Sequence, residues 1–265
     1  MMIPLSDLAG AAVALLLGLL FGLGVRRVGS SNRPPAGHMR ARTAVFTAGI
    51  LTFVVAWLLP GGSVVPAMTA HVLLAFAVPP LLLLGIPRPV LLPLFAHRRS
   101  RRLLQALTQP FRAGALFLLV LCLCYLPIVF NAALRNDGWR FGVELAVLSA
   151  AVLFWWPVIE PLPAWDRELA DVGKLLYLFV GSATLKTLGF ILATTPRPIY
   201  TLPSQSRPLW GLSASNDQQY AGWLMVAAGT FVLLAAATVI CAHLLHEPNE
   251  AHVSLQPGDQ RMAEE

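Results

Sequence analysis

The sequence predicts an all-α membrane protein with seven transmembrane helices, and three observations lead to this fold class. Of the 265 residues, 57% are hydrophobic and only 12% are charged, whereas roughly 25% are charged in an ordinary soluble domain. The hydrophobic residues gather in seven long runs with few charges, and most basic residues lie between alternate runs. Together these observations exclude a soluble enzyme, a nucleic-acid-binding domain and a disordered chain.

The predicted spans have the length that a membrane demands, since about 20 apolar residues cross a hydrocarbon core of about 30 Å. The seven runs are 5–25, 43–60, 66–86, 112–131, 140–160, 174–194 and 218–245. We interpret residues 1–246 as a single transmembrane domain. Residues 247–265 are polar and are predicted to form a disordered cytoplasmic tail.

The first three runs each have a recognisable boundary or break. In the first, the arginines follow the apolar stretch and only Asp7 precedes it, so we expect a retained span and not a cleaved signal peptide. The second stops at Pro60-Gly61-Gly62. The third contains Pro79-Pro80, where we expect a kink, because prolines in membrane helices are tolerated when neighbouring groups bond the freed carbonyls.

The last four runs follow the same pattern. The fourth contains Pro127, where a second kink is expected. The fifth carries Glu144 about one turn from its start, and the sixth carries Lys186 as the one basic residue that we place inside the bilayer. The seventh is an uninterrupted apolar run that ends before the polar tail.

The distribution of basic residues predicts the orientation. Fourteen of the 19 Lys and Arg residues fall on one side of the predicted spans and four on the other. By the positive-inside rule the richer side is cytoplasmic, so the N-terminus lies outside and the C-terminus in the cytoplasm. The net charge of +6 is therefore a topology signal, and we expect no nucleic-acid partner.

Met68 and His71 are the first candidate metal ligands. They lie three residues apart near the outer end of the third run, so on a helix they share one face. A thioether with an imidazole suits Cu(I) better than a hard cation. The structural alternative is a histidine bonded to a neighbouring helix beside a methionine that fills a gap.

Two further sulfur atoms are candidates at the same level of the membrane. Cys124 follows Cys122 in the fourth run, and residues two apart on a helix point about 200° away from each other. The two cysteines therefore cannot hold one ion unless the helix unwinds near Pro127. Met225 lies toward the outer end of the seventh run. The alternative for these residues is simple hydrophobic packing.

Glu144 and Lys186 are predicted to form an ion pair facing the interior of the bundle, because an uncompensated charge in lipid is costly. We then expect Lys186→Met to be tolerated better than Glu144→Gln, since the second change leaves a buried ammonium without its partner. The alternative function built on this pair is a small-solute or ion transporter. The odd number of spans and the lack of a repeated broken helix count against it.

The sequence contains no HExxH motif, no GxSxG motif, no phosphate-binding loop and no paired catalytic carboxylate motif. No nucleophile and base can be named. We therefore predict that the protein is not an enzyme.

Four segments resemble the seven-span CtaG family of cytochrome c oxidase assembly factors. Pro66–His71 followed by Val78–Pro87 resembles that family's third span, and Phe154-Trp155-Trp156-Pro157-Val158 its fifth. Leu209–Ser213 and Asp217–Met225 resemble the stretch that leads into its last span. The resemblance covers about residues 60–245, in matching order and spacing.

The resemblance implies a multi-pass protein of the bacterial plasma membrane that helps to mature a haem–copper oxidase, by bringing copper to its metal centre. Its implied partners are the lipid bilayer, cytochrome c oxidase subunits and a copper chaperone outside the cytoplasm. The family's His-Met-x-x-His pattern is here Ala67-Met68-Thr69-Ala70-His71, so one histidine is missing. Two more are replaced, at Tyr125 and Leu145. Two interpretations remain open: Cu(I) bound by a reduced set with Cys124, or a metal-free scaffold that acts as a structural partner.

Overall fold

The computed structural model describes residues 5–27, 36–91, 97–161, 169–203 and 211–246, and the elements within these ranges are helical. The predicted tail, 247–265, lies outside them. The helices are α1 (Leu5–Arg27), α2 (Ala36–Leu58), α3 (Val64–Val72), the π-helical segment η2 (Leu73–Ala77), α4 (Val78–Gly85), α5 (Arg88–Leu91), α6 (Arg98–Leu107), α7 (Pro110–Cys124), α8 (Pro127–Arg135), α9 (Asp137–Ile159), α10 (Asp171–Thr194) and α11 (Ala214–His246). The prediction of an all-α protein is confirmed.

Five stretches of the described chain are long and apolar enough to cross a membrane. They are Gly37–Leu58, Val64–Gly85, Asp137–Ile159, Asp171–Thr194 and Ala214–Val239. The pair α6–α7, bent by 69°, is a sixth if it counts as one span, and the apolar stretch Gly10–Arg26 of α1 is shorter. The protein is therefore a multi-pass membrane protein with five or six candidate spans, and the seventh stays a prediction.

The tandem prolines of the third span change the helix type without ending the helix. In a regular α-helix the carbonyl of Ala75 would accept from residue 79, and in a π-helix from residue 80. Both positions are proline and have no N–H group. The indole Nε1 of Trp155 on α9 donates to this carbonyl instead, at 2.9 Å. The two prolines thus create an acceptor that fastens the third span to α9.

Pro127 has a stronger effect than the predicted kink. The helix α7 ends at Cys124, and α8 starts afresh with Pro127 in its first turn. A proline is well suited to that place, because the first helical N–H has no acceptor in any case. The fourth predicted span, 112–131, is therefore wrong in its second part, where a separate short helix stands.

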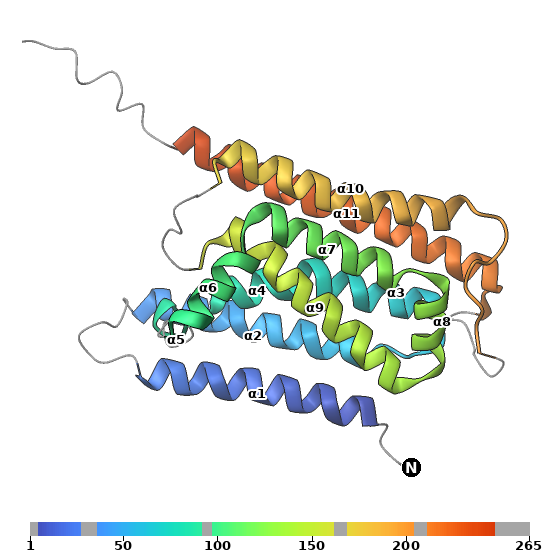
Figure 1. The fold of residues 1–265 in the computed structure, drawn as a ribbon, viewed down its shortest axis with the longest axis horizontal. Coiled ribbons are helices and arrows are strands. Elements are labelled where there is room, and N and C mark those ends of the chain that lie inside the picture. Colours follow the sequence, from blue (N-terminus) through green and yellow to red (C-terminus); the bar gives the residue numbers. More distant parts are fainter. Residues whose placement is uncertain (1–4, 28–35, 92–96, 162–168, 204–210, 247–265) are drawn as a thin grey trace, which may run out of the picture.

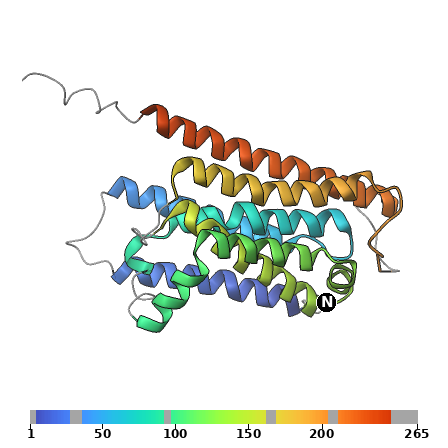
Figure 2. The ribbon, with the colours of Figure 1, turned by 45° about the horizontal axis from the view of Figure 1, so that its top comes forward.

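The segment α3–η2–α4 occupies the centre of the bundle, where it contacts α2, α9 and α11. The hairpin of α10 and α11 covers one side (Figures 1 and 2). A Cβ on Gly222 would lie 2.5 Å from the Gly189 carbonyl oxygen, so the backbones of α10 and α11 touch. Close approach of this kind is how small residues stabilise helix pairs in lipid, where hydrophobicity does not drive association.

The two ends of the bundle carry different short helices. The helix α8 lies at one end, together with the start of α1 (Figure 1). At the opposite end lie α5, α6 and the end of α11. The described chain thus begins at one end of the bundle and finishes at the other.

Candidate functional site

The first turn of α3 is held from another helix by a buried carboxylate. Asp217, in the first turn of α11, is fully buried and accepts hydrogen bonds from the Ser63 hydroxyl at 2.9 and 3.0 Å. It also accepts from the backbone N–H groups of Val64 at 2.7 Å and Val65 at 3.3 Å. An anion at a helix N-terminus binds the free N–H groups and offsets the helix dipole. Asp217 therefore caps α3 in place of a local side chain.

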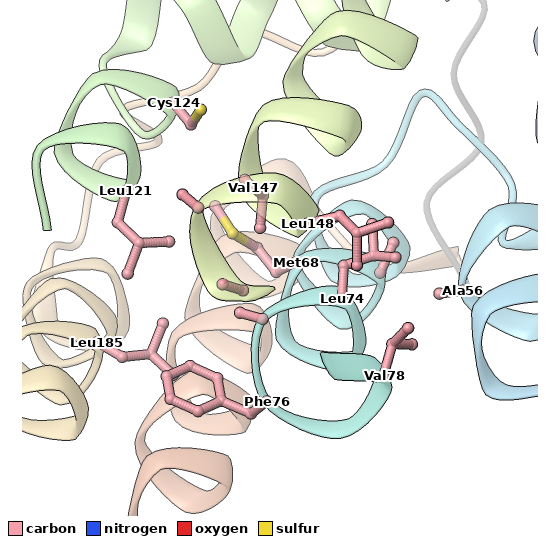
Figure 3. Close-up of a cluster of buried hydrophobic side chains, with 14 of the residues drawn as sticks. Ala56, Met68, Leu74, Phe76, Val78, Leu121, Cys124, Val147, Leu148 and Leu185 are labelled. Atoms are coloured by element: carbon pink, nitrogen blue, oxygen red, sulfur yellow. The ribbon is translucent and has the colours of Figure 1, made fainter. Parts of the chain in front are cut away.

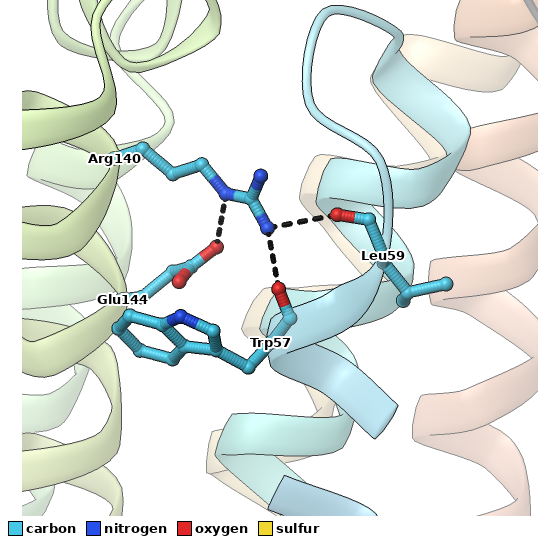
Figure 4. Close-up of polar contacts among 4 residues, drawn as sticks. All are labelled: Trp57, Leu59, Arg140 and Glu144. Carbon is cyan, nitrogen blue, oxygen red and sulfur yellow. Dashed lines mark hydrogen bonds and ion pairs between the residues drawn. The ribbon is translucent and has the colours of Figure 1, made fainter. Parts of the chain in front are cut away.

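The C-terminus of α2 is capped by a cation, in contrast to the anion at the N-terminus of α3. Arg140, near the start of α9, donates from Nη2 to the carbonyls of Trp57 at 3.0 Å and Leu59 at 2.8 Å (Figure 4). Its Nε donates to Glu144 Oε1 at 2.8 Å, one turn further along α9. A cation at a helix C-terminus is favourable for the same electrostatic reason. The turn between α2 and α3 is thus fixed by a cation on one side and an anion on the other.

This fixed turn sets the position of Met68 and His71, which follow within two turns of α3. Met68 is fully buried, and His71 is 4% exposed. The His71 ring lies 5.6 Å from the Tyr125 ring and 5.9 Å from the Phe130 ring, between centroids. Within the described chain, His71 Nδ1 and the Tyr125 hydroxyl have no hydrogen-bond partner. Buried polar atoms are rarely left in this state, because each costs about 1–3 kcal/mol.

The other two predicted sulfur ligands lie on different sides of this region. Cys124 is buried and lines a pocket of about 630 Å³ between α7, α8 and α9, with Gly138 and Gly142. Met225 is fully buried on α11, where its Cβ faces Gly189 of α10. In Figure 3 the Met68 sulfur lies among aliphatic side chains such as Val147 and Leu148, with Cys124 further off. The structure brings Met68 and His71 onto one helix, and within the described residues Cys124 and Met225 lie on other helices, apart from this pair.

The donor types also limit what the site can bind. The described part of the chain has no group of three or more His, Cys, Asp or Glu side chains arranged to hold a metal ion. A metal site here would therefore depend on methionine sulfur. Such a set fits Cu(I) and does not fit a hard cation such as Mg²⁺.

A second hydrogen-bond network joins the start of α11, the loop after α10 and the end of α7. The buried Gln218 accepts from the backbone N–H groups of Ile199 at 2.6 Å and Tyr200 at 3.4 Å, and donates to the Leu192 carbonyl at 3.3 Å. The Tyr200 hydroxyl donates to the Tyr125 carbonyl at 3.0 Å. Burial raises the pKa of Tyr200 well above its usual value, so the phenol stays protonated and remains a donor. The loop after α10 is thereby tied to the residue beside His71.

Lys186 does not take the place that we predicted for it. The ion pair of Glu144 is with Arg140, on its own helix. The Lys186 ammonium lies 5.7 Å from the Phe179 ring centroid, and its stem packs beside Gly229 of α11. The physical reason is the place of each cation in the bundle: Arg140 lies on the same helix as Glu144, whereas the Lys186 stem packs between α10 and α11. Arg140 is also the nearer cation, four residues away on one helix face.

Sequence reasoning missed three of the residues that build this region. Arg140 could have been found, because Arg and Glu at a spacing of four are neighbours on a helix. Trp155 could have been found in part, since Pro79-Pro80 leave the Ala75 carbonyl in need of a donor. Asp217 gives no local signal, because its partners Ser63 and Val64 lie more than 150 residues away.

The fold and this region together define a class: a polytopic helical membrane protein with a network of buried polar side chains around the turn between α2 and α3. The chain matches the model of the family described as cytochrome c oxidase caa3 assembly factor over residues 19–247. It belongs to that family. No curated protein and no solved structure matches the chain.

Proposed function

We propose that this protein assists the assembly of a cytochrome c oxidase by holding Cu(I) on the outer side of the bacterial plasma membrane. It acts as a non-catalytic carrier within a seven-span bundle, with its N-terminus outside and its C-terminus in the cytoplasm. The copper is its cargo. The partners that follow are oxidase subunits as acceptors and an extracytoplasmic copper chaperone as the donor.

The observation that carries this proposal is the state of His71. Its Nδ1 is buried and lacks a hydrogen-bond partner within the described residues, and the Met68 sulfur lies one turn earlier on the same helix. An imidazole nitrogen and a thioether are ligands that Cu(I) accepts. Met225 on the adjacent α11 and Cys124 beside Tyr125 are the proposed additional sulfur donors.

The test is the copper content of the purified protein. Met68→Leu with His71→Phe removes both proposed donors while it keeps a similar side-chain volume in a buried region. We expect the native protein, loaded with Cu(I) under reducing conditions, to bind about one equivalent and the double variant to lose it. Thermal unfolding of both proteins checks that the fold is kept.

The chain contains its own matched control. His38 and Met39 are the same two residue types at the opposite end of the bundle, where His38 is exposed. His38→Phe with Met39→Leu is expected to leave the copper content unchanged. A double variant at Met68 and His71 that retains full copper would overturn this site. Co-purification with oxidase subunits in the absence of bound copper would point to the metal-free scaffold.

A further inference from the structure

The helix α6 is unlike every other long helix of the described chain, because none of its residues is buried. We propose that α6 and the first turn of α7 form an interfacial anchor that binds the headgroups of anionic phospholipids on the side of the bundle opposite to α8. This inference is independent of the copper proposal. It rests on the faces of α6, its exposure, its direction and its charge.

The two faces of α6 have opposite chemistry. At 100° per residue, Leu103, Leu104 and Leu107 fall on one face of the helix. Arg98 and Arg102 fall at the centre of the other face. A short helix with this division of basic and apolar residues is typical of segments that lie in the plane of a membrane interface.

The apolar face is only partly covered by the rest of the described chain, in which Leu104 and Leu107 are half-buried. Leu103 is 61% exposed, and Phe111, at the start of α7, is 88% exposed. Apolar side chains in this position are costly in water and favourable at the boundary between headgroups and acyl chains. The leucine face of α6 therefore suits contact with acyl chains, and the arginine face suits contact with phosphate groups.

The direction of α6 places both faces where such a lipid would be. The helix is bent by 69° from α7 at the break between the two helices. If α7 follows the membrane normal, α6 lies closer to the membrane plane than to the normal. Figure 1 shows α6 at the end of the bundle, beside α5. With the exposed Leu103 turned toward the acyl chains, Arg98 and Arg102 on the opposite face would lie at the level of the headgroups.

The charge of this surface selects anionic lipid. The exposed arginines of α6 and its surroundings are Arg88, Arg98, Arg99, Arg101, Arg102 and Arg112. Guanidinium groups bind phosphate oxygens with paired N–H donors. Free phosphate would use the arginines alone, whereas a phospholipid uses the arginines and the leucines together. We therefore assign the site to a lipid such as phosphatidylglycerol.

The experiment measures how much phosphatidylglycerol stays bound to the full-length, detergent-purified protein in native mass spectrometry. Phosphatidylcholine and inorganic phosphate are the comparison ligands. We expect phosphatidylglycerol to bind much more tightly than phosphatidylcholine. Arg98→Gln with Arg102→Gln should weaken its binding by about 25-fold, which corresponds to about fivefold for each arginine near an anionic surface.

Two further variants make the result decisive. Arg135→Gln with Arg197→Gln removes two exposed arginines at the opposite end of the bundle and should change nothing. Leu103→Ser keeps every charge and should also weaken binding, because it removes the apolar contact. Equal binding of the two lipids, unchanged binding after the Arg98 and Arg102 replacements, or displacement of the lipid by an equal concentration of inorganic phosphate would each overturn the proposal.

Discussion

Arg140 links α9 to the end of α2 through a single guanidinium group. It donates to two carbonyls at the end of α2 and to the carboxylate of Glu144 on α9. Only 3% of the Glu144 side chain and 16% of the Arg140 side chain are exposed. Partly buried charges of this kind are retained only when both partners and their hydrogen bonds are in place. The role of the pair is therefore to hold the turn between α2 and α3 in position.

Replacement of Glu144 is expected to cost more stability than replacement of Lys186. Glu144→Gln leaves Arg140 without its counter-charge, and we expect a loss of about 2 kcal/mol. Lys186→Met keeps the packing beside Gly229 and gives up an ammonium–ring contact worth about 0.5–1 kcal/mol. Thermal unfolding of the two variants in one detergent checks the order, and the opposite order would contradict it.

Asp217 is the second residue whose replacement has a defined effect. Asp217→Ala leaves the buried Ser63 hydroxyl and the Val64 N–H without their acceptor, and we expect a loss of about 3 kcal/mol. Asp217→Asn keeps one acceptor oxygen and should fall between the alanine variant and the native protein. Unfolding in denaturant measures both variants. Equal stability of the alanine and asparagine variants would show that the carboxylate has no capping role.

At the scale of elements, the third span depends on a bond from outside its own backbone. The Ala75 carbonyl is bonded by Trp155 on α9 because both possible backbone donors are prolines. In a hydrocarbon environment no water can replace a lost partner. The join between α9 and the third span is thus a polar contact inside an otherwise apolar core.

Trp155→Phe is expected to destabilise the protein by about 2 kcal/mol, because it leaves the Ala75 carbonyl without a donor. The matched control is Trp223→Phe, at a residue of α11 that is 51% exposed and makes an edge contact with Phe190. That change should have little effect. Thermal unfolding of the two variants distinguishes them, and similar losses would count against the role of the indole N–H group.

Two glycines on different helices should respond in opposite ways to the same substitution. Gly222→Ala places a Cβ 2.5 Å from the backbone of α10 and should separate α10 from α11. Gly142→Ala meets nothing within 4 Å and should stabilise α9 slightly, because alanine favours helix more than glycine does. Unfolding temperatures of both variants give the comparison. A neutral Gly222→Ala would show that the two helices can move apart without cost.

At the scale of the whole molecule, the sequence predicted the helical class, the family and most span boundaries, because apolar runs and prolines act locally. It also placed Met68 and His71 on one helix face. The sequence did not predict Arg140 as the partner of Glu144 or Asp217 as the cap of α3. Both depend on which helices become neighbours, and a pattern of hydrophobicity does not specify that. The break at Pro127 was underestimated, because a kinked helix and two separate helices have similar sequences.

Opposite ends of the bundle should be accessible from opposite sides of the membrane. Asn136→Cys, before α9, should react from outside with a membrane-impermeant maleimide, in a background where Cys122, Cys124 and Cys241 are replaced by alanine. Gln105→Cys, in α6, should react only after the cells are opened. Labelling of intact cells measures the difference. Reaction of both positions from outside would contradict the predicted orientation.

The π-helical segment Leu73–Ala77 has a consequence for comparing relatives of this protein. It contributes one residue beyond a regular helix, and one residue rotates everything after it by about 100°. The first half of the span can therefore face α11 while the second half faces α2 and α9. A chain shortened by one residue at this point would turn one half away from its neighbours. We accordingly expect family members to vary in residue type between His71 and Pro79 but to preserve the length of that interval.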